Sequence, residues 1–242
     1  MSHPLLPEVV TQLHTLGYHT GDRVYVRALV PKNTPNDAAL RYGLAFEPQP
    51  GQVVPLPKDG YLTVSDAGLP FTEIKRCKET GKWIDKRAHL DGLTFIDSLN
   101  KKGYGVYLVV NIGGRENEDI LRCPSLFYEC DKISKEEQFD KVDELTREGF
   151  QPSFVLETRN SLHVYFRTFE DEVDGWRQLQ QRIIQRQESD KSIHNPNRLM
   201  RLAGFYHWQW NAETSQLDSF RLQIRLTTQA IYRRSDFDNF LP

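Results

Sequence analysis

The sequence predicts an α+β protein in which a sheet is covered by helices. From residue 91 onward, strand-like and helix-like stretches follow one another with little irregular chain between them. Residues 105–111 are an apolar run typical of a strand that is buried on both faces. Residues 124–131 are a second such run, which ends in two acids. The order strand, strand, helix, strand, strand, helix indicates one sheet with helices packed on it.

The first ninety residues carry weaker patterns. Apolar spacing and turn residues predict a helix at 7–17, a strand at 23–30, β-prone pieces at 42–46 and 61–64, and a hairpin formed by 71–76 and 82–86. The rest of residues 31–70 is rich in Pro, Gly and Asp and has no assigned structure. The hairpin carries six bases, Lys75, Arg76, Lys78, Lys82, Lys86 and Arg87. They could contact a phosphate backbone, and a simply solvated hairpin is the alternative.

Later elements are clearer. We expect a helix from 93 to Gly103, a strand at 105–111, a helix that begins with the capping box Ser134–Glu137 and ends at Gly149, two strands within 153–168, and a helix at 173–187. These elements suggest an N-terminal lobe at 1–90 and a core at 91–215. Residues 216–242 would pack on the core or lead to a missing domain.

The composition is that of a soluble chain of 242 residues, long enough to bury a substantial core. No apolar run approaches the roughly 20 residues that cross a bilayer, and the N-terminus lacks a basic segment leading into an apolar one. We therefore expect a cytoplasmic protein without membrane contact. Cys77, Cys123 and Cys130 form no Cys-x-x-Cys pair, so neither a disulfide framework nor a cysteine zinc site is indicated.

Charge is unevenly distributed along the chain, although the formal net charge is only -2. Residues 116–150 carry eleven acids and five bases, mostly on one expected solvated helix. Residues 191–242 carry seven bases and four acids. The basic part could follow a phosphate backbone, so the distribution permits nucleic-acid binding without requiring it.

Two acids stand one residue apart at the end of the run 124–131. In a strand, Glu129 and Asp131 point to the same face while Cys130 points to the other, into the core. Carboxylates held about 5 to 7 Å apart raise each other's pKa unless a cation lies between them. Mg²⁺ and Mn²⁺ prefer such oxygen ligands, often together with phosphate oxygens. The alternative is a strand end that frays into a solvated acidic turn.

Two later stretches favour a functional reading of these acids. Within 153–168, two β-rich runs meet at an Arg-Asn-Ser turn, which places Ser161 and His163 near the start of the second run. Within 189–205, a lone Asp190 is followed by Arg198 and Arg201. Arg198 and Arg201 lie three residues apart, close to one helical turn, and so can face the same way. Taken singly, Asp190 could be a turn acid, His163 a half-buried sheet residue, and the two arginines partners in surface salt bridges.

The order of these motifs resembles the catalytic core of the archaeo-eukaryotic primase superfamily, and in particular the primase-polymerases of plasmids, phages and other mobile elements. The resemblance rests on the acid-x-acid strand, Ser-x-His opening a strand, and a lone Asp followed by Asn-Pro-Asn-Arg-Leu-Met-Arg-Leu-Ala-Gly-Phe. It covers about residues 104–207, and 23–30 look like the early Arg-bearing strand of that group. Glu129 stands where Asp is commoner, and Ala203 where Pro is frequent.

The resemblance implies an α/β-type palm: an RRM-like mixed sheet flanked by helices, with an N-terminal α/β lobe. It assigns Glu129, Asp131 and Asp190 to catalysis and to binding of Mg²⁺ or Mn²⁺. It assigns nucleotide binding to Ser161, His163, Arg198, Arg201 and Asn111. The implied reaction is nucleotidyl transfer from NTPs or dNTPs on a single-stranded DNA template, with a helicase or other replication protein in trans or in a missing domain.

Other classes of protein stay open. A metal-dependent nuclease could use Glu129, Asp131 and Glu157, but the acid-x-Lys pattern of a common nuclease core is absent, since Arg159 stands at that position. A non-catalytic RNA-binding module could share the topology, but it would not need three acids. The paired histidines of a rolling-circle initiator and the Gly-x-x-x-x-Gly-Lys loop of an ATPase are both absent from the sequence.

Overall fold

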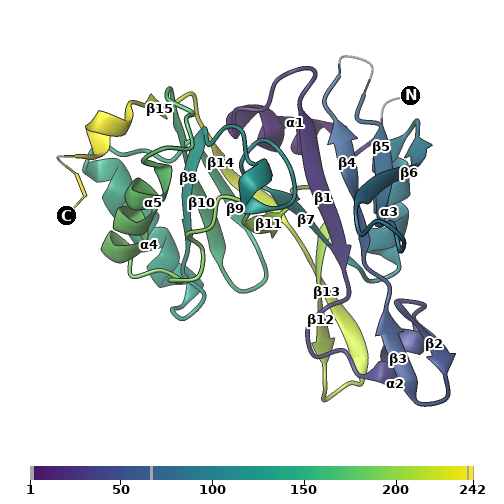
Figure 1. The fold of residues 1–242 in the computed structure, drawn as a ribbon. Coiled ribbons are helices and arrows are strands. Elements are labelled where there is room, and N and C mark those ends of the chain that lie inside the picture. The colour runs from purple at the N-terminus through teal and green to yellow at the C-terminus, as the bar shows by residue number, and fades with distance from the viewer. Residues whose placement is uncertain (1–2, 66–67, 239, 242) are drawn as a thin grey trace.

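The computed structural model describes residues 3–65, 68–238 and 240–241. Two sheets stand side by side, and helix α1 (Leu6–Thr15) lies between them at one end (Figure 1). Gln12 on α1 bonds to the backbone of Arg201 and Ala203 in the first sheet region. The carbonyl of Leu16, just after α1, accepts a hydrogen bond from Ser125 of the second sheet. The helix therefore ties the two sheets together, and the outcome confirms an α+β fold.

The first sheet has six antiparallel strands in the order β11-β7-β1-β4-β5-β6. Their bounds are β1 (Arg23–Leu29), β4 (Lys58–Thr63), β5 (Phe71–Arg76), β6 (Trp83–His89), β7 (Gly105–Val109) and β11 (Leu199–Arg201). Helix α3 (Gly92–Lys101) packs on this sheet, and Asp91 caps it by accepting from Thr94 N–H. Because β7 pairs with β1 and β11 pairs with β7, this sheet contains chain from both the predicted lobe and the predicted core.

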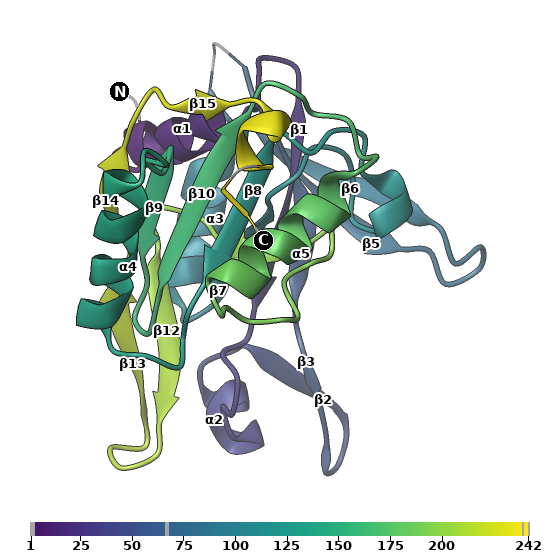
Figure 2. The same ribbon diagram turned by 90° about the vertical axis from the view of Figure 1, so that its left-hand side faces the viewer.

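The second sheet carries the carboxylate strand. It consists of β8 (Ser125–Glu129), β9 (Phe154–Glu157), β10 (Leu162–Thr168), β14 (Gln223–Thr227) and β15 (Ile231–Tyr232). The parallel pairing of β10 with β15 makes it a mixed sheet, as expected. Helices α4 (Lys135–Arg147) and α5 (Trp176–Arg186) lie in front of it in Figure 2. The capping box of Ser134 and Glu137 at the start of α4 is confirmed.

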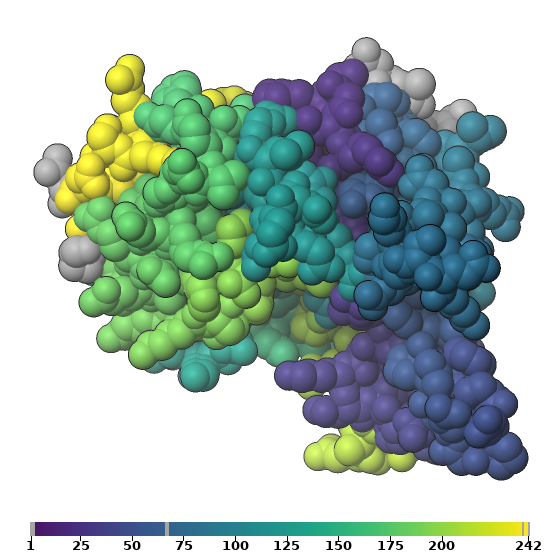
Figure 3. All heavy atoms as spheres, in the orientation of Figure 1, coloured from purple at the N-terminus to yellow at the C-terminus, as the bar shows by residue number. Residues whose placement is uncertain are grey.

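Two small β-ribbons project from the same end of the molecule (Figure 1). One is formed by β2 (Ala45–Gln49) and β3 (Gln52–Pro55) next to the short helix α2 (Asn36–Arg41), and the other by β12 (Tyr206–Asn211) and β13 (Gln216–Arg221). In the space-filling view, the surface is hollowed between this projection and the side that carries α5 (Figure 3). Short 3-10 turns occur at Asn117–Asp119 and Arg234–Phe237.

Several predicted bounds need correction. The carboxylate strand ends at Glu129, and Asp131 lies in the turn that leads to α4, so the two acids do not share a strand face. Arg198 and Arg201 are not on a helix, because Leu199–Arg201 pair with Tyr107–Val109 as an edge strand.

The chain division at 90 and 215 stays a prediction, and its outermost positions, 1–2 and 242, lie outside the described residues. After residue 215, β14 pairs with β9 and β15 with β10. Among the helices that the structure describes, none is long and apolar enough to cross a membrane. The cytoplasmic location stays a prediction.

Helix α5 seals the free side of β8, which pairs with β10 alone among the described strands. The buried side chain of Gln180 accepts from Phe127 N–H at 3.0 Å and donates to Phe127 C=O at 2.6 Å and to Ile193 C=O at 3.2 Å. The indole of Trp176 donates to Ser125 C=O. A polar side chain thus replaces the missing strand neighbour and fixes the strand that ends in Glu129.

We predict that Gln180→Leu lowers the free energy of unfolding by about 2 to 4 kcal/mol, because it leaves buried backbone groups of β8 without partners. Urea denaturation followed by circular dichroism measures this loss. The matched control is Gln178→Leu, the same change at an exposed position of α5, which should alter stability by less than about 0.5 kcal/mol. Equal stability of the two variants would contradict the sealing role of Gln180.

Candidate active site

A pocket of about 200 Å³ opens between the two sheets and collects most of the predicted site residues. Its lining includes Glu129, Asp131, Ser161, His163, Arg198 and Arg201. They come from the end of β8, the β9–β10 turn, the start of β10, and the segment that enters β11. Asp190 lies at the rim, where it lines an adjoining hollow together with Asp131. Asn111 lies behind the pocket and not on its surface.

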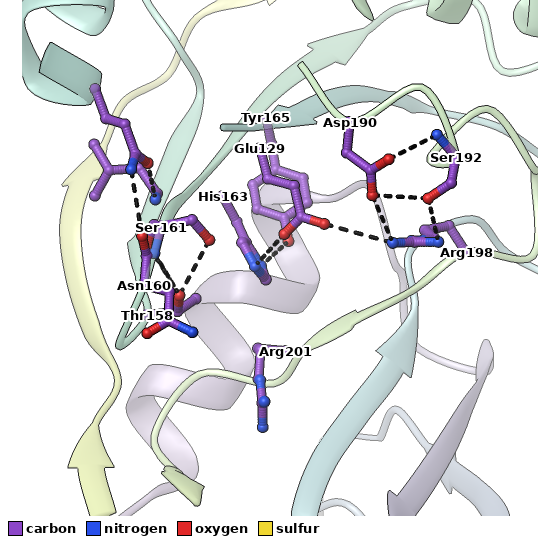
Figure 4. Close-up of polar contacts among 12 residues, drawn as sticks. Glu129, Thr158, Asn160, Ser161, His163, Tyr165, Asp190, Ser192, Arg198 and Arg201 are labelled. Atoms are coloured by element: carbon purple, nitrogen blue, oxygen red, sulfur yellow. Dashed lines mark hydrogen bonds and ion pairs between the residues drawn. The ribbon is translucent and has the colours of Figure 1, made fainter. Parts of the chain in front are cut away.

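The Glu129 carboxylate contacts two basic side chains, those of His163 and Arg198. Its Oε2 is 3.0 Å from His163 Nε2, since His163 and Glu129 are direct partners across β10 and β8. Its Oε1 is 3.5 Å from an Arg198 guanidinium nitrogen. On the other side of the imidazole, the hydroxyl of the fully buried Tyr165 lies 3.5 Å from His163 Nδ1. The ring of His163 is therefore held from both nitrogens (Figure 4).

Asp190 and Glu129 contact the same guanidinium nitrogen of Arg198. The nearest Asp190 oxygen is 3.6 Å from Arg198 Nη2. Both Asp190 oxygens also accept from Ser192, one from its N–H at 2.9 Å and the other from its hydroxyl at 2.7 Å. A backbone hydrogen bond from Asp190 N–H to Glu129 C=O at 3.3 Å fastens this segment to the end of β8. Figure 4 shows the Glu129 and Asp190 carboxylates directed at the same nitrogen of Arg198.

The turn that carries Arg198 is clamped from two sides. Asn111 donates from Nδ2 to Pro196 C=O at 3.0 Å, and its Oδ1 has no partner among the described residues. Asn197 donates from Nδ2 to Arg115 C=O at 3.0 Å. Arg198 N–H closes the turn on Asn195 C=O. The observed contact of Asn111 is with this turn, and its direct contact with a nucleotide stays a prediction.

Arg201 forms a second cationic position, apart from the carboxylates (Figure 4). Its guanidinium lies 4.4 Å from the ring centre of Tyr107, its partner across β11 and β7. Its Nη1 is buried and has no hydrogen-bond partner among the described residues. A buried guanidinium with an unused N–H is suited to an anionic ligand, because leaving such a group without a partner is costly.

Ser161 belongs to a rigid turn at the mouth of β10. Its hydroxyl is 3.2 Å from that of Thr158, and Thr158 N–H donates to Ser161 C=O at 2.8 Å. The buried Gln138 of α4 accepts from Leu162 N–H and donates to Asn160 C=O. The turn is thus fixed by its own hydroxyls and by α4.

Electrostatics keep Glu129 ionised. Burial alone raises the pKa of this carboxyl, but its hydrogen bond to His163 and the nearby charges of His163 and Arg198 outweigh burial and lower the pKa from 4.5 to about 2. Among the described residues, no three His, Cys, Asp or Glu side chains already converge as a metal cage. The donor set of Glu129, Asp131 and Asp190 is nevertheless all oxygen, which suits Mg²⁺ or Mn²⁺ better than a softer metal.

Three further residues belong to the site and were missed in the sequence: Ser192, Tyr107 and His207. Asp190-x-Ser192 has the spacing at which an Asp accepts from the N–H two residues on, so this signal was present. Tyr165 is an aromatic residue that could stack on a base by its type, but it is buried beside His163. Tyr107 and His207 line the pocket through pairings that are distant in sequence and left no local pattern.

Comparison with protein-family models finds no match, and comparison with curated protein sequences finds none. Solved structures give matches. The AEP domain of the cyanophage S-2L primase-polymerase superposes with a TM-score of 0.62 at 21% identity, covering 98% of this chain and 97% of that one. Primase RepB′ superposes with a TM-score of 0.53 at 15% identity, covering 95% of this chain and 58% of the RepB′ chain. The RepB′ catalytic domain in complex with initiator DNA superposes with a TM-score of 0.51 at 13% identity, covering 95% of this chain and 88% of that domain's chain.

These matches define the class of fold. The chain has the fold of the AEP domain of the cyanophage S-2L primase-polymerase and of the catalytic domain of primase RepB′, which is the fold that the motif order predicted. At these identities the likeness concerns the fold, and the roles of individual residues depend on the geometry described above.

The lowered pKa of Glu129 predicts how acid affects the metal-free protein. The ionised carboxyl contributes roughly 3 kcal/mol of stability above pH 4.5, and this contribution is lost as the pH falls from 4.5 toward 2. Glu129→Gln lacks it at every pH. The difference in unfolding free energy between wild type and Glu129→Gln should therefore shrink in this window, as measured by urea denaturation at several pH values. A difference that does not change with pH would contradict the network.

Proposed function

We propose that this chain is the catalytic domain of a primase-polymerase, which joins nucleotides from NTPs or dNTPs on a single-stranded DNA template. The observation that carries the proposal is the pocket in which Glu129 and Asp131 meet His163, Arg198 and Arg201. Carboxylates and cations that alternate around one small cavity suit a triphosphate with its metal ions. A neighbour in fold was solved with initiator DNA, which supports a DNA template.

Glu129, Asp131 and Asp190 would hold Mg²⁺ or Mn²⁺. When bound, such ions lower the pKa of an attacking hydroxyl and neutralise the triphosphate. Asp131 is exposed at the pocket wall and its side chain has no hydrogen bond or ion pair with another described residue, so it can turn toward an ion without breaking one. The three acids come from two segments that are joined by the Asp190–Glu129 backbone bond.

The cationic residues would bind the phosphates. Arg198 now contacts Glu129 and Asp190 at 3.5 and 3.6 Å, which are long distances for charge-assisted bonds. Phosphate oxygens can therefore compete for its guanidinium. His163 would reach phosphates from the wall beside Glu129, and Arg201 would reach them from its position over Tyr107. Ser161 borders the same cavity.

The rival functions lack support in the geometry. A nuclease that used Glu157 as third ligand would need its carboxylate free, but both Glu157 oxygens bind cations, Lys135 on one side and Arg225 on the other. An RNA-binding module of this topology would need exposed aromatic rings on the sheet. Those on β8 and β10 are all buried: Phe127, Tyr128, Tyr165 and Phe166.

Primer extension tests the proposed reaction. With a primed single-stranded template, labelled nucleotides and Mg²⁺ or Mn²⁺, the wild-type chain should extend the primer. Asp131→Asn should reduce the rate at least about 100-fold, because a metal ligand is lost. The fold should survive, since Asp131 is exposed. The matched control is Asp140→Asn, at an exposed position of α4.

Comparable thermal midpoints for wild type, Asp131→Asn and Asp140→Asn would establish that all three are folded. Full extension by Asp131→Asn would overturn the assignment of this acid. Cleavage of the template without any extension would favour the nuclease. A parallel reaction without primer decides whether the chain can start a new strand. Reactions with NTPs alone or dNTPs alone decide whether it uses ribonucleotides or deoxyribonucleotides. The helicase or other replication partner stays part of the proposal.

A further inference from the structure

The β5–β6 hairpin is a cationic surface that the pocket does not account for. Its six bases, Lys75, Arg76, Lys78, Lys82, Lys86 and Arg87, are all exposed. Three acids, Glu73, Glu79 and Asp85, leave residues 71–89 with a net charge of +3, in a chain whose net charge is -2. Glu73 is buried and already binds Lys58 and Lys86. Asp85 lies 3.6 Å from Arg23. The positive charge of the hairpin is thus only partly neutralised.

Apolar side chains are interleaved with these bases. Trp83 is 38% exposed and Ile84 is 41% exposed, on a strand whose residues are almost all open to solvent. The Arg115 guanidinium lies 4.0 Å from the ring centre of Trp83. A surface that combines cations with an exposed aromatic ring is suited to single-stranded nucleic acid, since bases can stack only where they are unpaired.

The hairpin is connected to the pocket by direct contacts. Arg115, which stacks on Trp83, accepts through its carbonyl from Asn197 Nδ2 at 3.0 Å. The next residue, Arg198, contacts Glu129 and Asp190. The two regions also belong to one sheet, with β6 at one edge and Arg201 of β11 at the other. Five strand spacings separate these edges, about 24 Å, which corresponds to several nucleotides. In Figure 3 the hairpin (blue) lies at the surface beside the teal segment that contains Arg115.

We propose that the β5–β6 hairpin binds the backbone of the single-stranded template outside the pocket, with Trp83 as a stacking position. This inference rests on the proposed function and names the surface that holds its template. The competing explanation is that lysines on β6 merely protect an exposed sheet edge from pairing with another chain. That explanation predicts no effect of the hairpin charges on DNA affinity.

The test is the affinity for a labelled oligo-dT of about 20 nucleotides, measured by fluorescence anisotropy without nucleotides or metal. The hairpin variant is Lys78→Gln/Lys82→Gln/Arg87→Gln, which removes three exposed bases. The matched control, Lys102→Gln/Arg147→Gln/Arg177→Gln, removes three exposed bases from α3, α4 and α5 and their ends. Thermal midpoints verify that both variants are folded.

The hairpin variant should bind about ten-fold more weakly than wild type near 0.1 M salt, and its log–log salt slope should be shallower by about 2, because each lost phosphate contact contributes about 0.7. The control should stay close to wild type. Trp83→Ala should weaken binding with an unchanged salt slope. A blunt duplex DNA serves as a second probe. Equal losses of oligo-dT affinity in the hairpin variant and the control, or a loss of affinity in the hairpin variant for the duplex alone, would overturn the proposal.

Extension assays separate this inference from the proposed function. If the hairpin variant extends primers normally at saturating template concentration and poorly at low template concentration, the hairpin proposal and the proposed reaction both stand. If the hairpin variant loses oligo-dT binding while the wild-type chain extends nothing, the hairpin proposal stands and the proposed reaction fails. If the wild type extends primers and the hairpin variant binds oligo-dT as tightly as wild type, the hairpin proposal alone fails. A wild-type chain that does not bind oligo-dT would overturn the hairpin proposal, and primer extension would still decide the proposed function.

Discussion

The contact on which the site depends is that of the Arg198 guanidinium with Glu129 and Asp190. Two carboxylates in a partly buried place repel one another, and each would take up a proton more readily if no cation lay between them. Arg198 lies between them, at 3.5 Å from one and 3.6 Å from the other. His163 adds a further partner on the opposite side of Glu129. Glu129 therefore stays ionised, and Glu129 and Asp190 both lie next to one cation, in a place that divalent ions could occupy.

Much of the fold serves to keep that arrangement in place. Glu129 ends a strand that α5 seals through Gln180, and Asp190 is bound to the Glu129 carbonyl by its own N–H. Asn111 and Asn197 hold the turn that presents Arg198. Buried polar side chains are expensive unless they are satisfied. Here they form hydrogen bonds to backbone groups of the segments that carry the acids and arginines. These bonds hold the segments in fixed positions.

The parts of this structure that the sequence predicts are the local ones. An apolar run predicted β8, and the spacing of Ser134 and Glu137 predicted the start of α4, because both signals involve neighbouring residues. The prediction that the strand continues beyond Glu129 to Asp131 was wrong. Nothing within 124–131 marks that the pairing of β8 with β10 ends at the pair Glu129–His163. A helical spacing was inferred for Arg198 and Arg201 because they lie three positions apart. The pairing of Arg201 with Tyr107, which makes β11 a strand, depends on residues far away in the chain.

The central claim is that the pocket holds divalent ions and a nucleoside triphosphate together. A crystal structure of the chain with Mn²⁺ and a non-hydrolysable triphosphate tests it most directly, through the anomalous scattering of manganese. Our account predicts manganese peaks bound by Glu129 and Asp131, and phosphate oxygens in contact with Arg198 in place of its present contacts with Glu129 and Asp190. A triphosphate bound elsewhere, or a pocket in which Arg198 keeps both carboxylates and no manganese peak occurs, would contradict it.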